Sequence, residues 1–261
     1  MNRTADWFLG NTGQDVTVLN HLRVLPAAVV AIGFAVLARS LGAVSDGGAL
    51  AGVLVAFLMM LAAGLAGLLP LVAVFILTSL ATRWRSERKR NMGVAERGKG
   101  RSASQVLANL GAAALCFVAA IIFPRFSELL LVGALAALAE ATADTVSSEA
   151  GQAAAKQARM IVDFKPAPIG TNGAISLEGT FAGCIAACIV AWVGTFSGVV
   201  PGRWGAVIAV TGVVGMFFDS LLGATLENRG KMGNDSVNFV STVLAADLAL
   251  IIALVTDGAR M

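Results

Sequence analysis

Two aspartates of this chain lie within otherwise apolar stretches and could bind a metal ion. Asp144 precedes Thr145 and Asp219 precedes Ser220, each about one or two helical turns before its stretch becomes polar. A carboxylate at membrane depth costs about 2.5–3.5 kcal/mol even on insertion scales, so it usually faces a wet cavity or a partner charge. Two such carboxylates from different helices suit a hard cation such as Mg²⁺. We therefore predict that Asp144 and Asp219 bind Mg²⁺ and act in catalysis, with Glu149 as a further metal ligand. The alternative is that these acids pair with basic side chains of the loops or cap helices.

Cations and glycines alternate in the segment from Arg97 to Arg101, directly before an expected helix. Glycine allows backbone N–H groups to approach a phosphate, and the cations neutralise its charge. Polar residues inside the following helix and the last apolar stretch need partners, because hydrocarbon offers them none. We predict catalytic roles for Lys99 and Arg101. The predicted substrate and nucleotide ligands of this group are Asn91, Arg97, Gly98, Gly100, Ser104, Asn109 and Asn238.

Two glycine-containing turns, SDGG at 45–48 and IGTNGAIS at 169–176, each precede an apolar stretch. Glycine permits close backbone approach, and a helix N-terminus offers free N–H groups to anions. We predict that Asp46, Thr171, Asn172 and Gly173 contribute to the binding site. The alternative is ordinary helix capping by Asp46 or Asn172. Neither turn is a P-loop, and GKGRS at 98–102 also lacks the GxxxxGK[ST] spacing.

The elements that must position these residues are apolar stretches of membrane-spanning length. Of the 261 residues, 57% are apolar and only 13% are charged, whereas a soluble domain carries about 25% charged residues. We therefore predict an integral membrane protein with one all-α domain, a polytopic helical bundle over residues 1–261, after a polar segment at 1–23. The eight predicted transmembrane helices, each of about 20 apolar residues, cover 24–42, 47–64, 66–82, 103–123, 128–149, 177–199, 204–226 and 237–256.

The basic loop at 83–102 fixes the predicted orientation, because Lys and Arg concentrate in cytoplasmic loops. If this loop is cytoplasmic, alternation of the eight helices places fourteen of the 19 Lys and Arg residues on the same side. Both termini then lie outside, and the active face is cytoplasmic. We predict a multi-pass protein of the cell (inner) membrane. Within the loop, Arg83 to Arg90 act mainly as a topology anchor, whereas the segment from Arg97 to Asn109 carries the chemistry.

The cytoplasmic face lacks histidine, which limits the reactions it could catalyse. The only histidine of the chain, His21, lies on the predicted outer side, so no Ser-His-Asp or Cys-His arrangement is available inside. Phosphoryl transfer relies on positioning and charge neutralisation. A phosphate acceptor is already an anionic nucleophile and needs no general base. Cations, Mg²⁺-binding carboxylates and glycine-rich turns would suffice for that reaction.

Two pairs of segments resemble each other and suggest an internal repeat. SDGGALAG at 45–52 resembles TNGAISLEG at 171–179, and SLATRW…NMG at 79–93 resembles SLLGATLE…KMG at 220–233. Two four-helix halves of the same orientation, a 4+4 repeat, would produce this pattern. The alternative is chance recurrence of small residues, which are common in membrane helices.

Five ordered motifs between about residues 45 and 250 resemble one integral membrane family, which includes plant and cyanobacterial phytyl-phosphate kinase. The motifs are RKRNMGVAERGKGRSASQVLANLG at 88–111, ADTVSSEAG at 143–151, GTNGAISLEGT at 170–180, FDSLLGATLEN at 218–228 and NDSVNFVSTVLA at 234–245. The resemblance implies a kinase that converts a prenyl phosphate to its diphosphate with a nucleoside triphosphate, often CTP. The implied partners are a prenyl-phosphate lipid, a nucleoside triphosphate and membrane lipid. Nucleic acid is not a predicted partner, because the sequence shows no basic face with regularly placed aromatic residues. A homodimer is left open.

Two other functions fit part of the same pattern. A CTP-dependent lipid-alcohol kinase or cytidylyltransferase would use the same inner face, but an alcohol acceptor calls for a base such as Asp144 or Glu149. A transporter of a lipid or small anion would fit the intramembrane acids and the repeat. A transport route should place polar residues across the whole membrane depth, whereas here they gather on one face.

Overall fold

The computed structural model describes residues 13–94 and 100–258, and helices dominate this part of the chain. The helices are α1 (Gly13–Ser40), α2 (Asp46–Ala63), α3 (Leu68–Arg83), α4 (Ser86–Asn91), α5 (Ala103–Ile122), α6 (Ser127–Ala154), α7 (Leu177–Phe196), α8 (Gly205–Leu222) and α9 (Asn234–Gly258). Within the described residues, seven helices are long and apolar enough to cross a membrane, and Val24–Ser40 of α1 is a shorter apolar helix. The predicted all-α membrane bundle is confirmed. Seven of its eight predicted spans reach full length.

The second and third predicted spans separate where the sequence places glycines and a proline. Gly64 ends α2 with a φ of +67°, which only glycine adopts at little cost. A short 3₁₀ helix (Leu65–Gly67) follows, and Pro70 lies in the first turn of α3, where its missing N–H has no intrahelical partner to lose. These residues turn the chain back tightly, so α2 and α3 are separate helices.

Helix α6 lies at the centre of the bundle, and α3, α5, α7, α8 and α9 pack around it. Its middle consists largely of buried alanines between Leu131 and Ala143. Glycines on the neighbouring helices face it: a Cβ at Gly183 would meet the carbonyl of Ala143, and one at Gly212 would meet Ala139. Small residues let membrane helices approach closely. The buried polar groups of α6 are therefore surrounded by protein.

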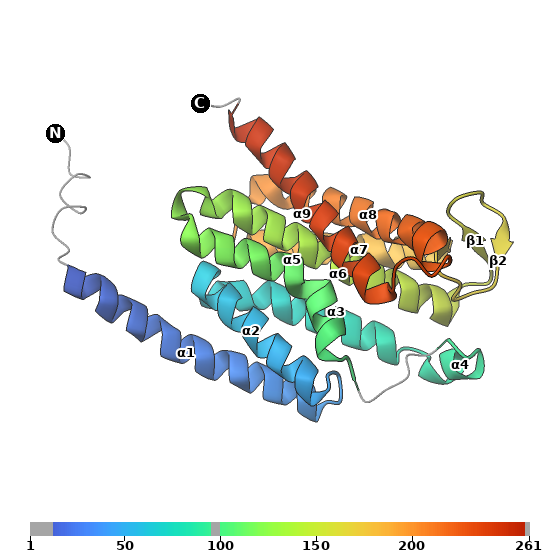
Figure 1. Cartoon of the computed structure of the whole chain (residues 1–261), viewed down its shortest axis with the longest axis horizontal. Helices are drawn as coiled ribbons and strands as arrows, with labels where there is room; N and C mark the ends of the chain where they lie inside the picture. The colour runs from blue at the N-terminus through green and yellow to red at the C-terminus, as the bar shows by residue number, and fades with distance from the viewer. Residues whose placement is uncertain (1–12, 95–99, 259–261) are drawn as a thin grey trace.

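The polar connections gather at one end of the bundle, which we call the loop end (residues 41–45, 84–94, 100–102, 155–176 and 228–233). In Figure 1, α1 begins and α9 ends at the left of the view, whereas α4 and the strands lie at the right. The turns at the opposite end are short. This arrangement agrees with the predicted alternation of spans, while the orientation in the cell and the 4+4 repeat stay predictions.

A small antiparallel sheet at the loop end was missed by the sequence analysis. It consists of β1 (Ala158–Met160), β2 (Pro166–Ala167) and β3 (Ala174–Ile175), in the order β2-β1-β3. Strand β1 pairs Ala158 with Ala167 and Arg159 with Ile175. Strands of two or three residues give almost no period-two pattern, so they read as loop in the sequence. The sheet folds the long 155–176 connection onto the end of the bundle.

Candidate functional site

A polar cavity of about 220 Å³ lies at the loop end, between α5, α6 and the start of α9. Five predicted site residues line it: Arg101, Asn109, Asp144, Glu149 and Asn238. The remaining lining residues are Val94, Gln105, Thr145, Ser148, Gln152 and Asn234. Segments far apart in the sequence therefore bring cationic, acidic and amide side chains to one hollow.

Arg101 is held in place by backbone pairing between two glycine-containing segments. Its N–H donates to the carbonyl of Ala43 at 3.0 Å, and its carbonyl accepts from the N–H of Ser45 at 2.9 Å. Gly100 has a φ of +87°, and a Cβ there would lie 2.6 Å from the backbone nitrogen of Val44. These glycines thus let the starts of α2 and α5 meet and present the Arg101 side chain. The role of Gly100 in the structure is therefore this backbone junction, whereas the sequence predicts it as a ligand-binding residue.

The first turn of α5 is stabilised by a capping box. The Ser102 hydroxyl accepts from the Gln105 N–H, and the Gln105 side chain accepts from the Ser102 N–H at 2.8 Å. Ser104, a predicted ligand, is exposed and bonds Ser102 at 2.9 Å. The structure therefore places Ser104 beside the cap and outside the lining of the polar cavity. Asn109, further along α5, does line this cavity.

A chain of polar side chains links α5, α9 and α8. With its amide oriented to suit its neighbours, Asn238 accepts from Asn109 at 3.2 Å and donates to the Asp219 carboxylate at 3.2 Å. The Ser241 hydroxyl also donates to Asp219, at 3.1 Å. Asn109 in turn donates to the carbonyl of Gln105 at 2.8 Å. Among the described residues, the hydrogen-bond partners that fix Asp219 next to the polar cavity, Asn238 and Ser241, are neutral.

Three carboxyl groups of α6 and α8, those of Glu140, Asp144 and Asp219, lie near enough to interact electrostatically. Asp144 interacts electrostatically with Asp219, and both interact electrostatically with Glu140. Arg101 is a cation that interacts with Asp144. Glu140 lies deeper, only 1% exposed, and its Oε1 has no hydrogen-bond partner among the residues that the structure describes. Within residues 13–94 and 100–258, no three Asp, Glu, His or Cys side chains are arranged to hold one metal ion by themselves.

This donor set fits a Mg²⁺ ion that is shared with substrate phosphates better than one that is enclosed by protein alone. Mg²⁺ usually binds to one or two carboxylates and completes its shell with water and substrate phosphates. Asp144 and Asp219 could supply those two carboxylates. Glu149, the third predicted ligand, instead forms an ion pair with Lys89 at 2.5 Å, although it also lines the polar cavity.

The first half of the basic loop is more than a topology anchor. Lys89 is 1% exposed, and its ammonium donates to the carbonyl of Thr82 at 2.7 Å as well as to Glu149. Arg85 and Arg88 donate to the carbonyls of Ala153 and Ala155 at the end of α6. These contacts tie α4 to α6 beneath the polar cavity. Sequence reasoning missed them because nothing in the spacing distinguishes Lys89 from its basic neighbours.

Several other predicted ligands lie away from the polar cavity. Asp46 is exposed and pairs with Arg39 at 2.5 Å, while Asn91 is exposed at the end of α4. Neither Asp46 nor Asn172 caps a helix: Ser45 caps α2, and Ser176 caps α7. Arg97, Gly98 and Lys99 lie outside the described residues.

The turn at residues 171–173 supports α8 instead of lining the polar cavity. Gly173 has a φ of +76°, and a Cβ there would clash with Ala224. The Asn172 carbonyl accepts from Asn228 at 3.0 Å, whereas Thr171 bonds within its own turn. This turn packs on the π-helical segment Gly223–Glu227 that follows α8. It can therefore influence the position of Asp219 only indirectly, through the end of α8.

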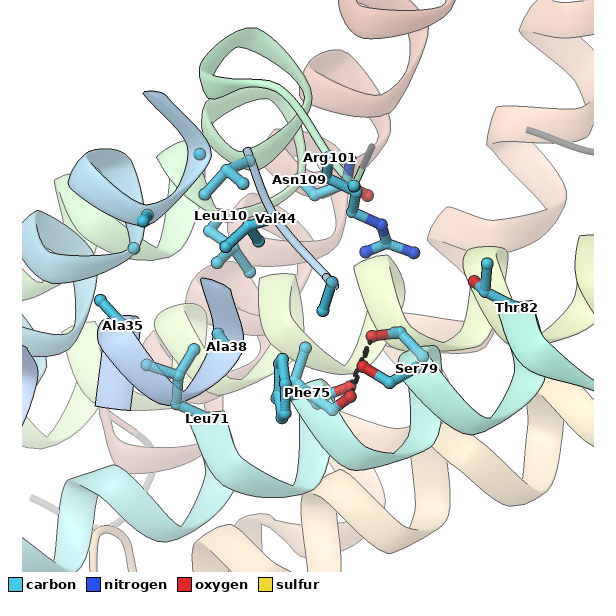
Figure 2. A pocket seen from close by; sticks show the side chains of 18 of the residues that line it. Ala35, Ala38, Val44, Leu71, Phe75, Ser79, Thr82, Arg101, Asn109 and Leu110 are labelled. Atoms are coloured by element: carbon cyan, nitrogen blue, oxygen red, sulfur yellow. Dashed lines mark hydrogen bonds between the residues drawn. The ribbon is translucent and has the colours of Figure 1, made fainter. Parts of the chain in front are cut away.

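A second, apolar cavity of about 250 Å³ adjoins the polar one and was not foreseen from the sequence. It lies between α1, α2, α3 and α5, and Arg101 and Asn109 line both cavities. Figure 2 shows the Arg101 side chain extending into this space, with Val44 and Leu110 nearby and Ala35 and Leu71 farther away. Its walls come from small and apolar residues such as Ala38, Gly52 and Phe75. A charged group at Arg101 could thus have an apolar tail in one cavity and a polar partner in the other.

The comparison with known protein families agrees with this membrane architecture. A family model described as Integral membrane protein DUF92 matches residues 29–246. The chain belongs to this family. Its membership confirms the resemblance drawn from the five sequence motifs.

Proteins similar to this chain are found in a plant, a cyanobacterium and an archaeon. The chloroplastic protein VTE6 of Arabidopsis thaliana is 33% identical over 195 residues, which cover 72% of this chain and 59% of VTE6. An uncharacterised membrane protein of Synechocystis is 34% identical over 72% of this chain and 74% of its own length. One of Methanocaldococcus jannaschii is 29% identical over 90% of this chain and 97% of its own length. The matched part of this chain thus spans about three fifths of VTE6, and no solved structure matches the chain.

Proposed function

We propose that this protein is a prenyl-phosphate kinase, which transfers the terminal phosphoryl group of a nucleoside triphosphate to a prenyl phosphate. One observation carries the proposal: an apolar cavity and a polar cavity share Arg101 and Asn109. A lipid phosphate needs such a junction, with hydrocarbon on one side and a charged headgroup on the other. The resemblance of the five sequence motifs to a family that includes phytyl-phosphate kinase supports the same choice.

The substrate phosphate would bind at Arg101, since a guanidinium presents several donors in a planar fork that suits phosphate oxygens. The acyclic prenyl chain would then extend into the apolar cavity. The triphosphate would approach from the loop end through the polar cavity, near Asn234 and Gln152. Both phosphates would meet beside Asp144, which interacts electrostatically with Arg101.

The reaction needs no residue that accepts a proton. A terminal oxygen of the ionised prenyl phosphate attacks the γ-phosphorus, forming a P–O bond as the bond from the γ-phosphorus to the β–γ bridging oxygen breaks. The products are prenyl diphosphate and a nucleoside diphosphate, which keeps the bridging oxygen and its electron pair. Catalysis of such transfers depends on positioning and on neutralising charge at the phosphates. Arg101 and the backbone junction that holds it would provide part of both.

Asp144 and Asp219 would hold Mg²⁺, which supplies positive charge to the phosphate oxygens when bound. The fit rests on the two neighbouring carboxyl groups and on the hydrogen bonds from neutral partners that position Asp219. Asn238 and Ser241 thereby become positioning residues for the metal ligand.

The proposal is tested with the purified protein, Mg²⁺, and phytyl or farnesyl phosphate combined with each of the four nucleoside triphosphates, CTP first. Mass spectrometry should detect the lipid diphosphate with at least one pairing. Absence of a diphosphate with every pairing would contradict the proposal. A nucleotide attached to the lipid, or a monophosphate formed from a prenyl alcohol, would instead assign the protein to the cytidylyltransferases or lipid-alcohol kinases.

A further inference from the structure

The apolar cavity extends from Arg101 into the membrane-spanning part of the bundle. Along α3 its lining runs from Arg83 to Leu71, a distance of about 18 Å at the usual helical rise of ~1.5 Å per residue. The charged residues Arg83 and Arg101 lie toward one end, and the hydroxyl residues Thr78 and Ser79 lie midway along α3. The far part is lined by residues such as Leu71 and Ala35 (Figure 2). A phosphate with a hydrocarbon chain has the same change from charged to apolar along its length. A lipid phosphate therefore fits this cavity in charge as well as in shape.

Not every small residue in this region mediates close packing, because one of them borders open space. In membrane proteins glycine usually allows two helices to pack closely, as Gly48 does here, where a Cβ would clash with the carbonyl of Arg101. Gly52, one turn further along α2, behaves differently: it lines the cavity, and a Cβ there would meet no atom within 4 Å. A larger residue at 52 would therefore fill the cavity without displacing a neighbour at its point of attachment.

We infer that Gly52 is a specificity-determining residue, whose missing side chain leaves room for a long prenyl chain. The inference rests on the proposed function and adds to it the place of the chain and the residue that limits its length. Phe34 and Phe75, whose rings meet edge to face at 5.3 Å, belong to the same cavity and connect α1 to α3. A chain bound from Arg101 passes Gly48 and then Gly52 before it reaches this far region.

The test compares two acceptors, phytyl phosphate and geranyl phosphate, whose chain is about half as long. Gly52→Phe should lower kcat/KM for phytyl phosphate relative to geranyl phosphate by about tenfold or more, since an apolar pocket discriminates at that level for a misplaced group of one or a few carbons. Gly52→Leu should change the same ratio in the same direction by less. The ratio is measured within each variant, so a lower yield of folded protein does not affect it.

Gly33→Phe is the matched control. Gly33 also lies in an apolar helix, and a Cβ there also meets no atom within 4 Å, but it is exposed on α1 and does not line the cavity. This variant should keep the wild-type ratio. The inference is overturned if Gly52→Phe keeps the wild-type ratio, or if Gly33→Phe changes it as much.

A binding measurement separates this inference from the proposed function. A photoreactive phytyl phosphate should label wild type and Gly33→Phe on the cavity-lining parts of α1, α2 or α3, and should label Gly52→Phe several-fold less. If the wild-type protein shows no turnover but gives this labelling pattern, the kinase proposal fails and the chain-binding cavity stands. Equal labelling of all three proteins, or labelling confined to other helices, would overturn the inference.

Discussion

At the scale of single residues, the candidate site consists of a cation and two carboxyl groups that lie around one hollow. Arg101 lines both cavities, Asp144 interacts with it electrostatically, and Asp219 is held by neutral partners. None of the three roles requires a proton to be transferred. Each of these side chains can therefore be tested by removing its charge while keeping its size as nearly as possible.

Replacing Arg101 with Ala should lower kcat/KM for the prenyl phosphate by about 10²–10³-fold, the usual cost of removing one group that stabilises developing charge. Arg101→Lys should recover only part of the activity, because an ammonium cannot make the bidentate contact of a guanidinium. Arg90, which is exposed on α4, provides the matched control. If Arg90→Ala reduces activity as strongly as Arg101→Ala, the role given to Arg101 is wrong.

Asp144→Asn and Asp219→Asn should each lower turnover by roughly 10²-fold or more, because an amide binds Mg²⁺ much more weakly than a carboxylate. Asp219→Asn should keep its thermal unfolding temperature, since the amide oxygen can still accept from Ser241. The Mg²⁺ concentration for half-maximal activity should rise in any variant with residual turnover. Wild-type Mg²⁺ dependence in both variants would exclude them as metal ligands.

At the scale of elements, the loops that appear polar in the sequence act mainly by fixing the helix ends. Arg85, Arg88 and Lys89 bond to α3 or α6, and the turn at residues 171–173 packs on the end of α8. The cavity residues are positioned by these contacts. Stability and activity should consequently respond to different parts of the same loop.

The buried pair of Lys89 and Glu149 should matter more for stability than for chemistry. Lys89→Met leaves an uncompensated carboxylate in a half-buried place and should cost about 3–5 kcal/mol of unfolding free energy. Combining it with Glu149→Met should restore much of that loss, because the isolated charge is gone. Unfolding of the two single variants and the double variant in mild detergent measures this. A double variant as unstable as the sum of the single ones would contradict the assignment.

Gly100→Ala should lower activity at least about tenfold, because a misplacement of an ångström near reacting groups can cost 10²-fold. Its Cβ would contact the backbone at Val44 and displace Arg101. Gly93→Ala is the control, since Gly93 also has a positive φ but a Cβ there meets no atom within 4 Å. Both variants share the backbone strain, so the difference between their kcat/KM values isolates the junction. Equal values would show that the junction does not position the site.

The sequence predicts some parts of this site well because membrane burial itself makes them conspicuous. Asp144, Asp219, Asn109 and Asn238 are recognisable as polar residues inside apolar helices, and the structure gathers them. Surface polarity carries no such signal, which explains why Asp46 and Asn91 were assigned to a site that they do not line. Lys89 was missed for the converse reason, since its burial depends on the fold of α4 against α6.

At the scale of the whole molecule, the helices pack around a central α6, and the candidate site lies at one end of the bundle. Apolar length predicts the bundle and nearly all of its spans, because the bilayer imposes both. The apolar cavity depends instead on the angle between α1 and α3 and on where small residues face, which no periodicity specifies. Its junction with the polar cavity gives the molecule its proposed function as a place where a lipid phosphate meets a nucleotide.

The most direct test of that claim follows the terminal phosphoryl group. Purified protein is incubated with phytyl phosphate, Mg²⁺ and CTP carrying a radiolabelled γ-phosphate, beside an Arg101→Ala sample and a sample without lipid. The account predicts that the label appears in phytyl diphosphate with the wild-type protein, that Arg101→Ala reduces this transfer by about 10²-fold or more, and that no labelled lipid forms without acceptor. If the label remains in CTP or appears only as inorganic phosphate, and the other nucleoside triphosphates behave alike, the central claim is contradicted.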